Sequence, residues 1–88
     1  MGRKAFKYDK VLSKKFGKKV SNLRKNNGLK QDETAFQIGI STSYLSAIER
    51  GISDSTISTA KRIAKVFGIE LYELFIFNKK KKIKCYKA

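Results

Sequence analysis

Residues 31–51, QDETAFQIGISTSYLSAIERG, constrain the fold of this chain most strongly. They predict two short helices, over residues 31–38 and 42–50, because each has apolar positions at helical spacing and a plausible start and end. Gly39 between them suits a tight turn that needs a positive φ. Gly51 suits the end of the second helix. The segment therefore predicts a pair of helices that cross at a short turn.

Apolar residues at helical spacing predict three further helices around this pair. The first helix follows a cap at Asp9 or Ser13, ends near residues 26–28 and carries the stripe Leu12, Phe16, Val20 and Leu23. The next follows a cap at Asp54, Ser55 or Thr56, ends at Gly68 and carries Ile57, Ala60, Ile63, Ala64 and Phe67. A short last helix covers residues 71–75, with Leu71, Leu74 and Phe75 on one side. No run alternates between apolar and polar residues as strands do, so we expect an all-α, five-helix fold.

The 88 residues suffice for one small domain and contain no apolar run long enough to cross a membrane. We expect a basic N-terminal extension at residues 1–8, the helical domain at 9–77 and a lysine-rich tail at 78–88. The single cysteine, Cys85, cannot form an internal disulfide, which favours a reducing, cytoplasmic location.

Positive charge is concentrated at the two ends of the chain. Lys and Arg number 21 against seven Asp and Glu, a net charge of +14. Residues 1–15 hold six basic residues and one acidic residue, and residues 76–88 hold six basic and none acidic. This balance favours a polyanionic partner, which is DNA, RNA or an anionic membrane. For the run 79–82 the alternative is a solubilising or disordered tail.

The predicted helix at 42–50 has one apolar side, formed by Leu45 and Ile48 together with Glu49. The opposite side carries Thr42, Ser43, Ser46, Ala47 and Arg50. That side lacks acidic residues, and its side chains are short and neutral except for the arginine. An ordinary solvated helix surface carries a mixture of Lys and Glu instead. Such a surface fits a helix that docks in a DNA groove, where a carboxylate would oppose the phosphates. The alternative is a surface helix rich in Ser and Thr that binds nothing.

Residues 16–75 resemble the Cro/CI-type, or xenobiotic-response-element, helix-turn-helix family, whose domains are lambda-repressor-like. The matching segments are LRKNNGLKQDETA at 23–35, IGIS at 38–41, SYLSAIERG at 43–51 and IAKVFGIELYELF at 63–75. The spacing of the motif is set by Gln31, Ala35, Gly39, Leu45 and Ile48. The chain departs from the family at Lys30, Glu70 and Ser55, and the first two weaken helix caps.

The resemblance implies a role for particular residues of this chain. Thr42, Ser43 and Ala47, with Ser46 beside them, fall at base-reading positions. The implied phosphate contacts are Gln31, Tyr44, Arg50, Ser53 and Thr56. For Tyr44, packing of the ring in the core is the favoured alternative. Arg24 and Glu49 are expected to form a partly buried, structural salt bridge.

The end of the predicted domain is unusually apolar. Its large side chains are Leu71, Tyr72, Phe75, Ile76 and Phe77. Because one small module makes few DNA contacts, strong binding generally needs two copies, and we expect this end to form a homodimer contact. The alternative is that Ile76 and Phe77 fold back on their own domain.

Nothing in the composition indicates catalysis. Histidine is absent, and the sequence contains neither a glycine-rich phosphate loop nor a cluster with metal-ligand spacing. We therefore expect no enzyme activity, no cofactor, no metal and no small-molecule effector.

The resemblance implies a sequence-specific regulator of transcription that binds a pseudo-palindromic double-stranded DNA operator as a homodimer. Small members of the family include controller proteins of restriction–modification systems, which the segment SYLSAIERG and the short tail most resemble. Phage repressors and antitoxins are the alternatives within the family. A protein that coats nucleic acid without sequence preference is the alternative outside it.

Overall fold

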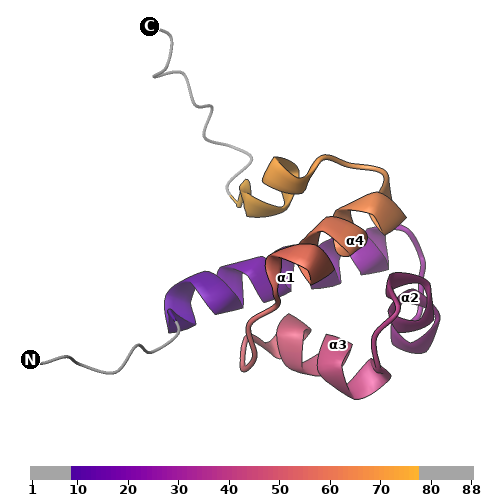
Figure 1. Ribbon diagram of the computed structural model, residues 1–88, viewed down its shortest axis with the longest axis horizontal. Coiled ribbons are helices and arrows are strands. Elements are labelled where there is room, and N and C mark those ends of the chain that lie inside the picture. Colours follow the sequence, from indigo (N-terminus) through magenta and orange to yellow (C-terminus); the bar gives the residue numbers. More distant parts are fainter. Residues whose placement is uncertain (1–8, 78–88) are drawn as a thin grey trace, which may run out of the picture.

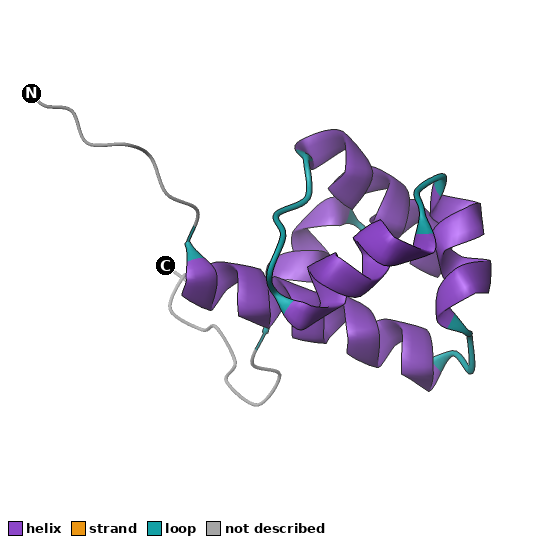
Figure 2. Cartoon of the chain, turned by 90° about the horizontal axis from the view of Figure 1, so that it is seen from below, coloured by secondary structure: helices purple, strands orange, loops and turns teal. Residues whose placement is uncertain are grey.

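The computed structural model describes residues 9–77, which form four α-helices and one 3-10 helix (Figure 1). These elements are α1 (Lys10–Asn26), α2 (Gln31–Ile38), α3 (Thr42–Arg50), α4 (Ile57–Phe67) and η1 (Leu71–Phe75). No strand occurs in this part of the chain (Figure 2), which agrees with the all-α prediction. The fifth helix is a 3-10 helix rather than an α-helix, as is usual for a run this short.

α3, α4 and η1 pack against α1. In Figure 1, α3 lies on one side of α1 and η1 on the other, while α2 sits at the end of α1 from which the chain turns back. α4 packs on α1, α2 and η1, and α2 packs on α3. None of the helices in residues 9–77 has the length and apolar character that a membrane span requires.

Side-chain caps fix three of the helix starts. Asp9, Ser41 and Thr56 each accept a hydrogen bond from the backbone N–H three residues later. At the turn between α2 and α3, Gly39 has φ of 89°, in the left-handed region that glycine enters without steric cost. The helix ends predicted at residues 26–28, Gly39, Gly51 and Gly68 are confirmed.

The two starts predicted to be weak lack a side-chain cap. Lys30 and Glu70 occupy the cap positions of α2 and η1 and accept no bond there. At each start, the side chain of the third helical residue instead bonds back to the backbone of the cap residue. The carboxylates of Glu33 and Glu73 accept the N–H groups of Lys30 and Glu70, at 3.3 and 3.2 Å.

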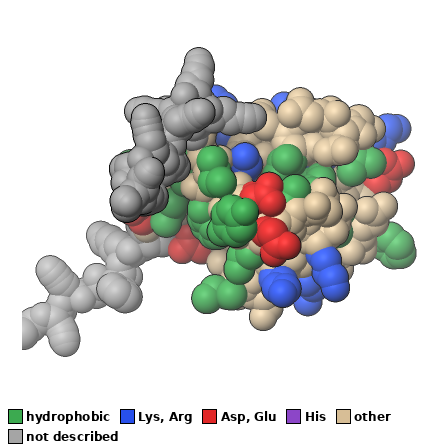
Figure 3. Space-filling view, turned by 90° about the horizontal axis from the view of Figure 1, so that it is seen from above, with side chains coloured by type: hydrophobic (Ala, Val, Ile, Leu, Met, Phe, Trp, Pro, Cys, Tyr) green, Lys and Arg blue, Asp and Glu red, His purple; other side chains and the backbone are tan. Residues whose placement is uncertain are grey.

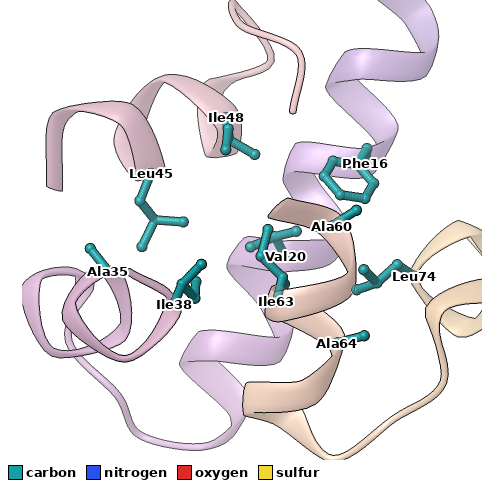
Figure 4. Close-up of a cluster of buried hydrophobic side chains, with 10 residues drawn as sticks. All are labelled: Phe16, Val20, Ala35, Ile38, Leu45, Ile48, Ala60, Ile63, Ala64 and Leu74. Carbon is teal, nitrogen blue, oxygen red and sulfur yellow. The ribbon is translucent and has the colours of Figure 1, made fainter. Parts of the chain in front are cut away.

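The core forms where α1, α3 and α4 meet, with α2 and η1 closing its two ends (Figure 4). Its buried apolar residues are Phe16, Val20, Ala35, Ile38, Leu45, Ile48, Ala60, Ile63, Ala64 and Leu74. The first residue of two predicted apolar stripes lies outside the core, because Leu12 is 44% exposed and Ile57 is 80% exposed. Both belong to the first turn of a helix, and no described element reaches far enough to cover them.

Two glycines allow α1 to touch the C-terminal end of α3. A Cβ atom on Gly17 would lie within 3 Å of the carbonyl oxygens of both Ile48 and Glu49. A Cβ atom on Gly51, the residue that ends α3, would lie 2.8 Å from Cα of Lys14. The backbones of α1 and α3 are therefore in direct contact, and this contact fixes where α3 sits.

Candidate nucleic-acid interface

The outer face of α3 is the candidate reading surface. α3 lies at the lower edge of the domain in Figure 1, and Figure 2 views the domain from that side. Thr42, Ser43 and Arg50 are exposed, whereas Ser46 and Ala47 are half-buried. Leu45 and Ile48 are fully buried on the opposite side of the helix. The division between an inner and an outer side agrees with the helical pattern of the sequence.

A buried ion pair holds α3 against α1. Nε and Nη2 of Arg24 donate to the two carboxylate oxygens of Glu49, at 2.8 and 3.0 Å. Nη1 of Arg24 donates to the carbonyl of Leu29 at 2.9 Å. The side chains of Arg24 and Glu49 are only 12% and 5% exposed. The hydrogen bond and charge of Glu49 raise the pKa of Arg24 despite the opposing effect of burial, so the guanidinium stays charged.

The side chain of Gln31 joins this ion pair. Its Nε2 atom donates to Oε1 of Glu49 at 3.0 Å. The contact places the first residue of α2, where backbone N–H groups have no intrahelical acceptor, beside the end of α3. The family resemblance implied a phosphate contact for Gln31, and the bond to Glu49 was not predicted from the sequence. The second N–H of the amide remains a candidate for a phosphate oxygen.

Tyr44 packs its half-buried ring against the core, as the favoured alternative for this residue proposed. Its hydroxyl donates to the backbone carbonyl of Asp54 at 3.1 Å. On the other side of the same loop, the hydroxyl of Ser13 donates to the carboxylate of Asp54. The loop between α3 and α4 is thus tied to both α1 and α3. Sequence reasoning missed the Ser13 contact, since a buried serine inside a helix gives no sign of its distant partner.

The two other candidate phosphate contacts lie at that loop. Ser53 is half-buried, and Thr56 is exposed. Thr56 caps α4, and its Oγ1 atom also lies 3.0 Å from Oγ1 of Thr59. Ser53 and Thr56 border the N-terminus of α4, where backbone N–H groups favour an anion, and exposed Arg50 is the last residue of α3.

The residues predicted to form a dimer contact lie at η1 and differ in exposure. Tyr72, Phe75 and Ile76 are 66%, 45% and 39% exposed, whereas Leu71 is half-buried against the core. The ring of Phe75 stacks on Phe16, with centroids 5.3 Å apart, and Phe77 packs edge-on against Phe75. Half-buried Phe77 therefore contacts its own domain, as the alternative for this residue proposed.

Hydrophobic side chains gather on the face of the domain that Figure 3 displays, beside acidic ones. A groove of about 230 Å³ near η1 has apolar walls formed by Leu12, Phe16, Ile57, Ala60 and Phe75. The exposed Leu12 and Ile57 are thus part of one apolar surface with Phe75. The lysine run 79–82 and Cys85 lie outside the described residues.

Comparison with known proteins gives a consistent result. The family model described as helix-turn-helix, HTH_3, matches residues 20–74. The HTH-type transcriptional regulator y4dJ of Sinorhizobium fredii is 35% identical over 63 residues, which cover 72% of this chain and 82% of that protein. The control protein C.MunI of a Mycoplasma species is 37% identical over 62 residues, covering 69% and 84% of the two chains.

A solved structure agrees with these relatives. The restriction–modification controller protein C.AhdI of Aeromonas hydrophila superimposes with a TM-score of 0.70 at 35% identity, over 72% of this chain and 96% of that one. The family model's residues 20–74 include both helices of the pair and the Arg24–Glu49 ion pair. This chain belongs to the Cro/CI-type helix-turn-helix family of transcriptional regulators.

Proposed function

We propose that the protein is a transcriptional regulator that reads a pseudo-palindromic double-stranded DNA operator as a homodimer. The observation that carries the proposal is the outer face of α3. This face is exposed at Thr42 and Ser43, free of carboxylates, and held rigidly by the Arg24–Glu49 pair. A net charge of +14 supplies attraction to the phosphate backbone that does not depend on sequence.

Base reading in this proposal rests on short side chains. Thr42, Ser43, Ser46 and Ala47 include no Gln, Asn or Arg that could make a bidentate contact to a base. The hydroxyl groups of Thr42, Ser43 and Ser46 bond to base edges. The methyl groups of Thr42 and Ala47 pack on thymine methyl groups. Specificity therefore depends partly on how easily the operator deforms.

Phosphate contacts in this proposal come from both ends of the helix pair. Gln31 serves at the start of α2, and Arg50, Ser53 and Thr56 serve around the start of α4. Tyr44 contributes when its hydroxyl proton turns from the carbonyl of Asp54 to a phosphate oxygen, since a phosphate oxygen only accepts hydrogen bonds.

The subfamily we propose is the controller protein of a restriction–modification system. C.MunI is described as a control protein and C.AhdI as a restriction–modification controller protein, and both are matched over most of their own length. The neighbouring genes test this assignment, since a controller is expected beside a methyltransferase and an endonuclease. A toxin gene or a block of phage genes there would favour the antitoxin or the repressor.

Selection of bound sequences from a random duplex pool tests the proposed function. We expect one enriched motif with two related halves about one helical turn apart. A competition gel shift should then show the operator bound at least ~10³-fold more tightly than a scrambled duplex. Equal binding of the two duplexes would show instead a protein that coats nucleic acid.

Replacing Thr42 with Gln is expected to change the preferred base at one position of each half-site. A glutamine there can bond to both N6 and N7 of adenine, and a mismatched pair costs about 1–3 kcal/mol. Repeating the selection with the variant measures the change. Asn26→Gln, at an exposed position of α1, is the matched control and should leave the motif unaltered.

Tyr72→Glu is expected to convert the dimer to a monomer if the surface at η1 forms the contact. Tyr72 is 66% exposed, so its replacement leaves the core of one copy intact, whereas a buried carboxylate opposes association. Analytical ultracentrifugation measures the oligomeric state of each variant. Phe36→Glu, at an 85% exposed position of α2, is the matched control and should remain dimeric. An unchanged Tyr72→Glu dimer would place the contact elsewhere.

A further inference from the structure

The outer side of α1 carries an unbalanced basic surface. α1 contains seven basic residues and no acidic one. Within residues 9–77 the one salt bridge is Arg24–Glu49, and residues 1–8 and 78–88 contain no Asp or Glu. The six lysines of α1 thus have no side-chain carboxylate as an ion-pair partner. Lys15 lies next to Lys18 and Lys19 on the helix surface, an arrangement that destabilises an isolated helix.

Part of this surface is a groove rather than a flat face. Lys15, Lys18, Lys19 and Asn22, at i, i+3, i+4 and i+7 along α1, line a concavity of about 360 Å³. The ring of Phe77 forms its other wall. From Lys15 to Asn22 the groove extends about 10 Å along the helix, roughly three base-pair steps of a DNA strand.

The groove lies away from the reading face. Gly17 marks the side of α1 that touches α3, because its backbone meets the carbonyls of Ile48 and Glu49. Lys15 and Lys19 are two residues from Gly17 in either direction, which is about 200° around the helix. The body of α1, about 10 Å wide, separates them from α3, and this distance matches the screening length at physiological salt.

We propose that this groove binds the phosphate backbone of a second DNA duplex while α3 holds the operator. The lysines neutralise successive phosphates, the Asn22 amide donates to a phosphate oxygen, and the Phe77 ring packs against the sugars. A membrane fits less well, because Phe77 is the one apolar side chain among the described residues that line the groove, and Phe16 and Val20 of α1 are buried in the core. One operator-bound protein thereby bridges two segments of DNA without reading the second.

The inference rests on the proposed function, and a bridging assay tests the two separately. Operator duplex from the selection is fixed to beads, loaded with protein, and mixed with a labelled duplex that lacks the operator. The test variant combines Lys15→Gln, Lys18→Gln and Lys19→Gln. The matched control combines Lys61→Gln, Arg62→Gln and Lys65→Gln, which removes the same charge from exposed positions of α4.

We expect the test variant to capture at least ~10-fold less labelled duplex. The slope of log affinity for that duplex against log salt concentration should become less steep by about two to three. Its affinity for the operator should stay within ~3-fold of the parent, and the control variant should capture normally.

Four outcomes would overturn the inference. They are no capture by a parent protein that binds its operator, equal loss in both variants, loss of operator affinity in step with capture, and capture of a labelled RNA hairpin in preference to DNA. Failure to obtain any operator would remove the proposed function and this inference with it.

Discussion

Gly17→Ala is expected to destabilise the domain by on the order of 3 kcal/mol. In an open helix this change would gain about 1 kcal/mol, because alanine is the better helix former. Here the new methyl group would overlap the carbonyl oxygen of Ile48 and approach that of Glu49. Backbone atoms cannot rotate away as a side chain can, so α1 and α3 must separate and loosen the core between them.

Urea and thermal unfolding measure the effect of Gly17→Ala. For a domain of this size, 3 kcal/mol corresponds to a fall in Tm of roughly 12–24 °C. Gly28→Ala is the control, because Gly28 has φ of 67° but nothing within 4 Å of an added Cβ, so only backbone strain of about 1–2 kcal/mol applies. If Gly17→Ala is no more damaging than Gly28→Ala, the close approach of the two helices is not what the structure indicates.

Glu49→Ala is expected to cost about 3 kcal/mol of stability. The change leaves the Arg24 guanidinium charged and largely buried, and it removes the acceptor of Gln31 Nε2. Arginine cannot relieve the loss by releasing its proton. Because the pair raises the pKa of Arg24, its contribution is complete below the unfolded-state pKa of arginine and is lost only in strong alkali. We therefore expect the same loss throughout pH 5–9.

A double variant separates the lost contact from the uncompensated charge. Arg24→Met with Glu49→Met replaces both ions by apolar side chains, a change that is often close to neutral. We expect thermal melts to rank the parent and the double variant above Glu49→Ala. A melt of Glu49→Ala that superimposes on that of the parent would show that the pair contributes nothing.

The Glu49 variant also connects stability with DNA binding. Arg24, Glu49 and Gln31 join α1, α2 and the end of α3, so one carboxylate orients both helices of the pair. Operator affinity measured well below the Tm of Glu49→Ala should therefore fall, while the variant remains helical by circular dichroism.

Local signals allowed much of the fold to be predicted. Asp9, Ser41 and Thr56 cap helices through bonds that reach only three residues, and the glycines at 39, 51 and 68 end helices through their own φ. Helical periodicity also separated the buried Leu45 and Ile48 from the exposed Thr42 and Ser43. It failed at Leu12 and Ile57, because periodicity shows which side of a helix is apolar and not how far the neighbouring elements extend to cover it.

The sequence by itself determined the helix pair, its turn at Gly39 and the chemistry of the reading face, because each depends on residues within one or two turns of one another. Only the tertiary structure decided that Gln31 bonds to Glu49 and that the backbone of α3 approaches α1 closely at Gly17. The same is true of the groove that Lys15, Lys18 and Lys19 form with Phe77. These contacts join residues 18 to 62 positions apart. Their distances are set by how the helices cross, which no local pattern in the chain specifies.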